Sequence, residues 1–244
     1  MIVYDCKPSL KAPLFIECLP GIGNVGKTAG DFIANSLKAE KFATIYSKHF
    51  PSQVLLNEDN IVEIMNNQLW YARDVNGRDI VFLTGNSQCS TQEGQFEFCM
   101  EVLDVLIEYG VSEIITLGGY GTGQIVETPR VFGAVSDLKI KKEFKEYGVE
   151  FPPGDPSAGI IGASGLFVGL GKIHEVPSIC LMGETSGYFI DHKSALAITR
   201  ILMKKLGVEF DLKELQDKSE QIDEITAKVK AMGHQDHPDL GYIG

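Results

Sequence analysis

The chain has 244 residues, of which 44% are hydrophobic and 23% are charged, and its formal net charge at pH 7 is −11. This length and composition are typical of a single ordinary globular core. Because nucleic acids and anionic lipid surfaces are bound through clustered Lys and Arg, the acidic charge argues against nucleic-acid and membrane partners.

The first part of the chain predicts a strand, a glycine-rich loop, a helix and a series of short strands. Leu14–Leu19 is a short apolar strand, and a helix follows over Val25–Leu37, where apolar residues recur every three or four positions. Asn76-Gly77 predicts a hairpin turn. The short strands are expected at Ala43–Tyr46, Gln53–Leu56, Ile61–Met65, Gln68–Asp74 and, after the turn, Asp79–Thr84.

The middle of the chain predicts a parallel sheet. Ile80–Leu83 has no polar alternation, which indicates a strand buried on both faces. A helix over Gln92–Glu108 ends at Gly110, and another apolar strand follows at Glu113–Leu117. A strand, a helix and a strand with short connections are typical of parallel pairing.

The next segments continue the alternation of strands and helices. Gly159–Gly171 holds five glycines among apolar residues, so we expect a tight connection or a short buried helix there. Pro152–Pro156 predicts a loop. The remaining expected elements are a strand at Val131–Val135, a helix at Asp137–Lys145, a buried strand at Ser178–Gly183 and a helix at His192–Leu206 capped by Gly207.

The last predicted element is a helix over residues 211–232. Its apolar residues, from Leu212 to Met232, form a narrow seam on an otherwise charged helix, which favours packing against another helix of the same chain or of a second copy. The remaining residues have no periodicity. We therefore predict one α/β domain over residues 1–232 and a flexible tail over residues 233–244.

The cysteines and the N-terminus favour a cytoplasmic protein. The five cysteines are scattered without a C-x-x-C pair, which argues against a disulfide framework or a zinc site. Met1–Cys6 lacks the basic start and apolar stretch of a signal peptide.

The glycine-rich loop matches two phosphate-binding patterns. Gly21, Gly23 and Gly26 fit G-x-G-x-x-G, and Gly21 and Gly26 with Lys27 and Thr28 fit G-x-x-x-x-G-K-T. A nucleotide would then be held by the loop amides, with Lys27 on its phosphates. The competing interpretation is that these glycines let the chain turn sharply and pack the helix close to the strand.

The partners that a phosphate site needs are missing from the sequence. The later apolar strands end in Thr84-Gly85-Asn86, Gly118-Gly119 and Gly183, with Glu184 as the one candidate metal acid. The histidines show no metal spacing, there is no G-x-S-x-G motif, and Cys89 lacks an identifiable base. We expect neither a catalytic centre nor a cofactor, although the strand-end loops 118–123 and 183–188 are placed where α/β sheets bind ligands.

Taken together, four segments resemble the proteasome assembly chaperone 2 family over roughly residues 13–232. They are the opening motif Leu19–Gly26, Leu117–Tyr120, Gly162–Leu166 and Leu181–Thr185. The resemblance implies a three-layer α/β sandwich similar to nucleoside phosphorylases, with a mainly parallel sheet, helices on both faces and no established catalytic centre.

The resemblance also implies homo-oligomers that dock on α-subunits of the proteasome core particle through a C-terminal tail. The family's tail ends in a hydrophobic residue, Tyr and any residue, whereas Tyr242 here is third from the end. The tail contacts it implies are Leu240, Tyr242, Ile243 and the carboxylate of Gly244. The alternative that Tyr242 and Ile243 fold back onto the body stays open.

The sequence therefore predicts a homo-oligomeric proteasome assembly chaperone or proteasome-binding factor without catalysis of its own. The alternative, from another class, is a nucleotide- or nucleoside-binding α/β enzyme that uses the loop Gly21–Thr28 as its phosphate site.

Overall fold

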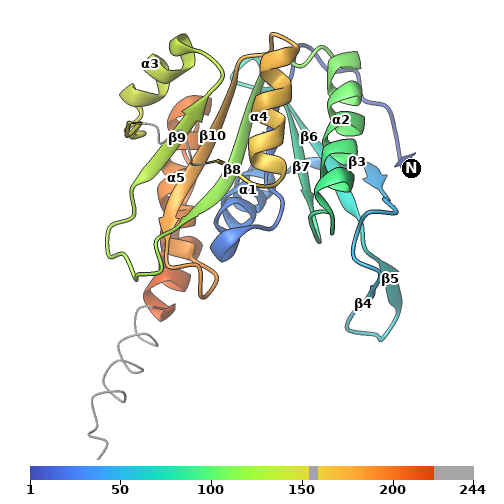
Figure 1. Ribbon diagram of the computed structural model, residues 1–244, viewed down its shortest axis with the longest axis horizontal. Coiled ribbons are helices and arrows are strands. Elements are labelled where there is room, and N and C mark those ends of the chain that lie inside the picture. The colour runs from blue at the N-terminus through green and yellow to red at the C-terminus, as the bar shows by residue number, and fades with distance from the viewer. Residues whose placement is uncertain (154–158, 223–244) are drawn as a thin grey trace, which may run out of the picture.

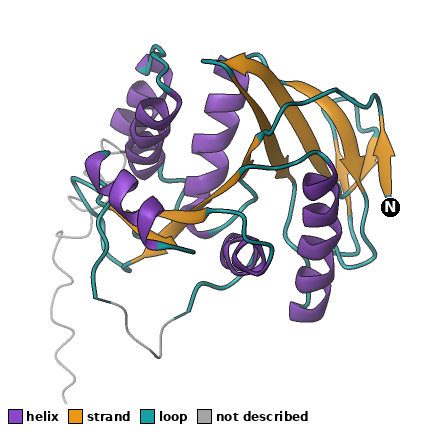
Figure 2. Ribbon diagram, turned by 90° about the horizontal axis from the view of Figure 1, so that it is seen from above, coloured by secondary structure: helices purple, strands orange, loops and turns teal. Residues whose placement is uncertain are grey.

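A computed structural model describes residues 1–153 and 159–222. Part of the predicted 152–156 loop, the second half of the predicted 211–232 helix and the predicted tail lie outside these ranges. One eight-stranded sheet forms the centre, and helices cover both of its faces (Figures 1 and 2). The strands of the sheet are β1 (Ile2–Tyr4), β2 (Leu14–Glu17), β3 (Glu40–Ile45), β6 (Asn67–Val75), β7 (Arg78–Gly85), β8 (Glu113–Gly121), β9 (Val131–Val135) and β10 (Ser178–Thr185). The helices are α1 (Val25–Ser36), α2 (Gln92–Glu108), α3 (Leu138–Glu146), α4 (Ala163–Ile173) and α5 (His192–Leu206).

The sheet is mixed, with its parallel strands in the middle and its antiparallel strands toward both edges. The strand order is β1-β3-β6-β7-β2-β8-β10-β9. Strands β7, β2, β8 and β10 run parallel to their neighbours in this group. The pairs β1–β3, β3–β6, β6–β7 and β10–β9 are antiparallel. The predicted α/β class is confirmed, and β1 is a three-residue strand that the sequence pattern did not reveal.

The central strands are apolar because both faces of the sheet are covered. In β2, Leu14 and Ile16 pack into the cluster beneath α1 and α5, whereas Phe15 packs into the cluster beneath α2 and α4. All three side chains are fully buried. A strand that lies between two helical layers has no face exposed to solvent and therefore needs no polar face. The uninterrupted apolar sequence of β2 thus agrees with the three-layer arrangement.

The turns and helix ends that the sequence predicts are confirmed. Asn76 and Gly77 have φ of 49° and 80°, as the hairpin between β6 and β7 requires. Asp137 caps α3 through its side chain, and Gly207 ends α5 in the left-handed conformation. The segment Gly159–Gly171, for which a tight connection or a short buried helix was expected, contains the helix α4. This helix starts directly after Gly162, whose φ is 96°.

Two of the predicted strands are not part of the main sheet. They form β4 (Val54–Leu56) and β5 (Val62–Ile64), an antiparallel pair that makes a separate two-stranded sheet. Figure 1 shows this pair, which we call the arm, projecting from the body.

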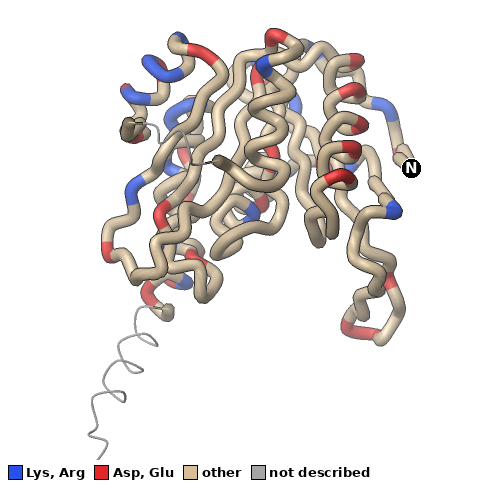
Figure 3. The backbone as a smooth tube through the Cα atoms, viewed as in Figure 1, with Lys and Arg blue, Asp and Glu red and all other residues tan. Residues whose placement is uncertain are grey.

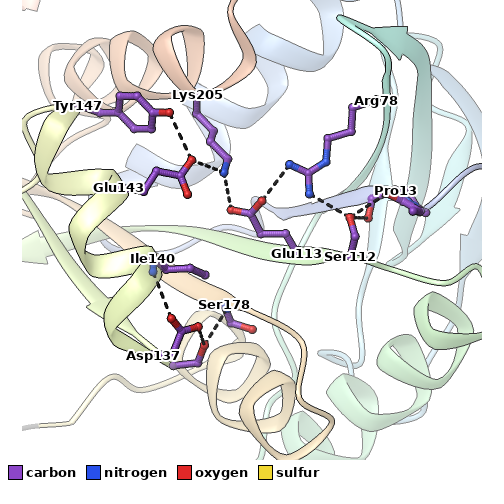
Figure 4. A network of polar contacts seen from close by, with 12 residues as sticks. Pro13, Arg78, Ser112, Glu113, Asp137, Ile140, Glu143, Tyr147, Ser178 and Lys205 are labelled. Carbon is purple, nitrogen blue, oxygen red and sulfur yellow. Dashed lines mark hydrogen bonds and ion pairs between the residues drawn. The ribbon is translucent and has the colours of Figure 1, made fainter.

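A buried ionic network joins four elements at the amino ends of the central strands (Figure 4). Lys205 on α5 lies 2.8 Å from Glu113 on β8 and 2.7 Å from Glu143 on α3. Arg78 on β7 donates to Glu113 over 2.9 Å. Because the side chains of Lys205 and Glu113 are both almost fully buried, each charge depends on its partners for compensation.

Candidate functional site

The glycine-rich loop lies at the carboxyl ends of the central strands, beside the loops that follow β8 and β10. Gly23 accepts a backbone hydrogen bond from Asp191 over 2.9 Å. A Cβ atom on Gly119 would lie 2.3 Å from the carbonyl oxygen of Ile22. The glycine-rich loop is therefore in direct contact with the loops that follow β8 and β10.

Close packing accounts for two of the three motif glycines. A Cβ atom on Gly26 would lie 2.2 Å from the carbonyl oxygen of Leu117, so α1 packs directly on β8. Gly23 has φ 60°, and a Cβ atom there would lie 2.8 Å from Oγ1 of Thr185. Gly21 is exposed and extended, with φ −152°. The geometry agrees with the packing interpretation of Gly23 and Gly26.

Lys27 is held on the side of α1 by two partners. Its Nζ lies 2.7 Å from Oδ2 of Asp31 and 3.1 Å from Oγ1 of Thr84. Thr84 in turn donates to Oδ1 of Asp31 over 2.6 Å. Thr28 is half-buried within α1. A phosphate-binding lysine instead meets the phosphates cradled by its loop, so the geometry gives the alternative of a phosphate site no support.

Glu184, the candidate metal acid, is engaged by an arginine. Arg130 donates from Nη2 and Nε to the two carboxylate oxygens of Glu184 over 2.8 Å and 3.1 Å. These hydrogen bonds lower the pKa of Glu184. Across residues 1–153 and 159–222, no three His, Cys, Asp or Glu side chains gather to hold a metal ion.

A buried carboxyl group at the end of β2 was missed by sequence reasoning. Glu17 is fully buried, accepts from the backbone nitrogen of Leu19 over 2.9 Å and accepts from Oγ of Ser164 over 2.8 Å. Burial raises its pKa to about 7, and the hydrogen bonds from Leu19 and Ser164 oppose that rise. The available signal was a Glu directly after three apolar strand residues.

The side chain of Gln88 connects the glycine-rich loop to α4 at the carboxyl ends of the central strands. Its Nε2 donates to the carbonyl oxygen of Pro20 over 2.8 Å, and its Oε1 accepts from the backbone of Ala163 over 2.9 Å. One amide thus links the glycine-rich loop to the first turn of α4. The hydrogen bond between Glu17 and Ser164 is a second link to the first turn of α4.

The outer surface of these loops is apolar. Tyr188 is 78% exposed, Ile22 is 53% exposed and Tyr120 is 49% exposed. The would-be Cβ atoms of Gly121 and Gly187 lie within 3.6 Å of the Ile22 side chain, so these loops meet around Ile22. Tyr120 lies apart from Ile22, because its neighbours Gly119 and Gly121 face Ile22 while its own ring packs against Phe132. Exposed large apolar side chains such as Ile22 and Tyr188 are typical of a protein contact.

The predicted tail contacts lie outside the described residues. Leu240, Tyr242, Ile243 and Gly244 follow residue 222, the last one described. Residues 213–222 are helical, as predicted, with Leu215 and Ser219 buried. Ser219 and Ile222 share a small pocket with His192 at the start of α5.

Comparison with known proteins identifies the family. The family model described as PAC2 family matches residues 15–230, so the chain belongs to the PAC2 family. The uncharacterized protein MJ1210 of Methanocaldococcus jannaschii is 33% identical over 99% of this chain and 96% of its own length. In Pyrococcus furiosus, PbaB, described as an archaeal proteasome activator, has 38% identity and a TM-score of 0.88, covering 94% of this chain and 98% of its own.

A second Pyrococcus furiosus structure agrees in fold. PbaA, described as an archaeal homolog of proteasome-assembly chaperone, has a TM-score of 0.79 and 23% identity, covering 96% of this chain and 93% of its own. The predicted family is confirmed. The expected similarity to nucleoside phosphorylases stays a prediction. Among the helices that the structure describes, none is both long and apolar enough to cross a membrane.

Proposed function

We propose that this protein binds the proteasome core particle as an assembly chaperone or activator. The observation that carries the proposal is the match to PbaB, at 38% identity and a TM-score of 0.88 over nearly the full length of both chains. Because that match extends through the whole fold rather than one motif, the role in PbaB's description is the best guide to this chain.

The proposal includes docking on α-subunits through the C-terminal tail. Tyr242 would be the aromatic anchor and the Gly244 carboxylate the charged end, with Leu240 and Ile243 beside them. The proposal also includes a homo-oligomer in the cytoplasm, because several tails on one assembly raise avidity without a strong single contact. The exposed apolar side chains of Ile22, Tyr120 and Tyr188 offer a contact surface on the body.

A pull-down of core particle or α-subunits tests this proposal. The full chain is compared with a version truncated after Met232 and with Tyr242→Ala, and Ile173→Ala, at a 73% exposed position at the end of α4, is the control. We expect binding by the full chain and the control, and loss with the truncation and Tyr242→Ala. Binding by the truncated chain would place the contact on the body, and failure of the full chain to bind would contradict the function.

Lys27→Ala separates this function from nucleotide binding. Lys27 contacts Asp31 and Thr84 within the fold, so we expect the variant to bind the core particle like the wild type. The wild type should show no ATP or GTP binding in isothermal calorimetry. Nucleotide binding that disappears in Lys27→Ala would instead support the phosphate-site alternative.

A further inference from the structure

One edge of the molecule is acidic along the exposed face of α2. This helix contains no Lys or Arg, and its exposed acids form a continuous stripe (Figure 3). Nε2 of His49 lies 2.7 Å from Glu97, and the N-terminal amine lies 3.6 Å from Glu101. The acids of the stripe are Glu93, Glu97, Glu101, Asp104 and Glu108, and the exposed apolar residues among them are Phe96, Met100 and Ile107.

The arm adds an aliphatic surface to the same edge. Val54 lies opposite Ile64, and Leu56 lies opposite Val62, so the four side chains share one face of the arm. They are between 54% and 63% exposed. An isolated two-stranded sheet is marginally stable in water, and aliphatic side chains gathered on one exposed face gain most from being covered by a partner. We call α2 and the arm the acidic edge.

The opposite end of the sheet is basic. Helix α3 exposes Lys139, Lys142 and Lys145, with one exposed acid, Glu146, and its first residue, Leu138, is 79% exposed. The other ionic groups of α3 are engaged: Lys141 lies over the Phe151 ring, and Glu143 contacts Lys205. We call α3 and the loop of residues 122–130 the basic edge.

That loop supplies an apolar counterpart to the arm. It carries the side chain of Ile125, which is 42% exposed. The remaining charges of the loop are Glu127, which is exposed, and Arg130, which pairs with Glu184 and Glu150.

The two edges lie at opposite ends of the molecule in matching positions. The sheet runs from β1 and β3 on the side of the arm to β9 on the side of α3. In Figure 1, α2 stands above the arm on one side, and α3 stands above the loop between β8 and β9 on the other. A second copy placed beside the first, with its helices α2 and α3 again above its arm and its loop, would bring α3 toward α2 and the loop toward the arm.

We propose that the acidic edge of one copy binds the basic edge of a second copy. The contact pairs the carboxylates of α2 with the lysines of α3, and the aliphatic face of the arm with the apolar loop around Ile125. Such a contact joins two different surfaces, and repeating it with a fixed rotation between neighbouring copies closes a ring, whereas copies related by translation alone would form an open filament. This inference rests on the self-association in the proposed function, and it names the surfaces responsible.

Charge complementarity favours a second copy over the chain's own tail. Residues 233–244 contain Asp236 and Asp239 and no Lys or Arg, so the acidic edge would repel this segment. The basic edge, in contrast, occurs once on each copy. Opposite charges across an interface set its register and speed its formation, which fits a contact between two copies held in one relative orientation.

The experiment measures molar mass by light scattering for charge-reversed full-length chains. One variant carries Glu93→Lys, Asp104→Lys and Glu108→Lys, and the other carries Lys139→Glu, Lys142→Glu and Lys145→Glu. We expect each variant to self-associate at least ~100-fold more weakly than the wild type, because three exposed ion pairs become repulsions. A chain with all six reversals should regain the oligomer, since the charges are again complementary.

Two further samples complete the test. Lys38→Glu with Lys172→Glu reverses exposed charges outside both edges, and this chain should keep the wild-type mass. Leu56→Asp with Val62→Asp on the arm should dissociate the oligomer while circular dichroism stays unchanged.

The outcomes distinguish this inference from the proposed function. A wild-type oligomer that survives both triple reversals would overturn the assignment of the two edges and leave the proposed function standing. Failure of the six-fold reversal to restore the oligomer while it stays folded would also overturn the pairing of α2 with α3. A monomeric wild type would overturn the self-association itself, and the pull-down would then decide separately whether the core particle is bound.

Discussion

Replacing the buried carboxyl group of Glu17 with an amide should stabilise the protein at neutral and alkaline pH. Glu17 is fully buried at the end of β2, and burial raises its pKa from 4.5 to about 7. In Glu17→Gln the amide oxygen can still accept from the Leu19 backbone. The amide nitrogen can donate to Oγ of Ser164, whose hydroxyl also lies 3.3 Å from the carbonyl oxygen of Leu117.

The size of the effect follows from linkage between proton binding and folding. Between pH 4.5 and about 7, the folded protein holds a proton on Glu17 that the unfolded chain has released, so the contribution of this group to stability falls as pH rises. Each pKa unit is worth about 1.4 kcal/mol. The wild type therefore loses up to about 3 kcal/mol of unfolding free energy through Glu17 across this range, and Glu17→Gln does not.

The assay is urea unfolding of both proteins at several pH values from 5 to 8.5. The difference in unfolding free energy, Glu17→Gln minus wild type, should rise with pH and level off above about pH 7.5. Glu93→Gln, on the exposed face of α2, is the control and should show a difference near zero throughout. A difference for Glu17→Gln that does not change with pH would refute the reasoning, because it would mean that Glu17 is ionised in the fold at ordinary pH.

Two further substitutions test the packing of the loop and the ionic network. Gly26→Ala should destabilise the fold by about 1–3 kcal/mol or more in urea unfolding, because its Cβ would lie 2.2 Å from a backbone carbonyl oxygen of β8. Gly21→Ala should stay within about 0.5 kcal/mol of wild type, and equal effects at the two sites would contradict the packing role. Lys205→Met should cost about 3–5 kcal/mol in the same assay because it leaves Glu113 short of one partner. Lys204→Met, at an exposed position, is the matched control, and a similar loss there would count against the network.

Local sequence patterns were sufficient for most of the secondary structure. The apolar run of β2, the Asn76-Gly77 turn and the Gly207 helix end each carry their signal within a few neighbouring residues, so their structures could be anticipated. Strand β1 could not, because three residues paired with β3 are too short for any periodicity. The separation of the arm from the main sheet depends on which strands pair, and strand periodicity alone does not determine pairing.

The role of the glycine-rich loop required the three-dimensional contacts. Its sequence matches phosphate-binding motifs, but Lys27 contacts Asp31 and Thr84, and Gly26 packs against the backbone of β8. Thr84 is 57 residues from Lys27 along the chain. A local sequence pattern cannot indicate that two residues so far apart in the sequence are in contact. The carboxyl group of Glu17 and its partner Ser164 were missed for the same reason, since 147 residues separate them.

The sequence by itself determined the α/β class, the helical and strand segments, the acidic charge and the family resemblance, because these depend on composition, periodicity and short motifs. The tertiary structure alone decided which residues meet: the buried setting of Glu17, the engagement of Lys27, the meeting of the strand-end loops at Ile22 and the placement of α2 and α3 at opposite ends of the sheet. These features arise from contacts between distant segments, and burial and pKa change only when the fold brings those segments together.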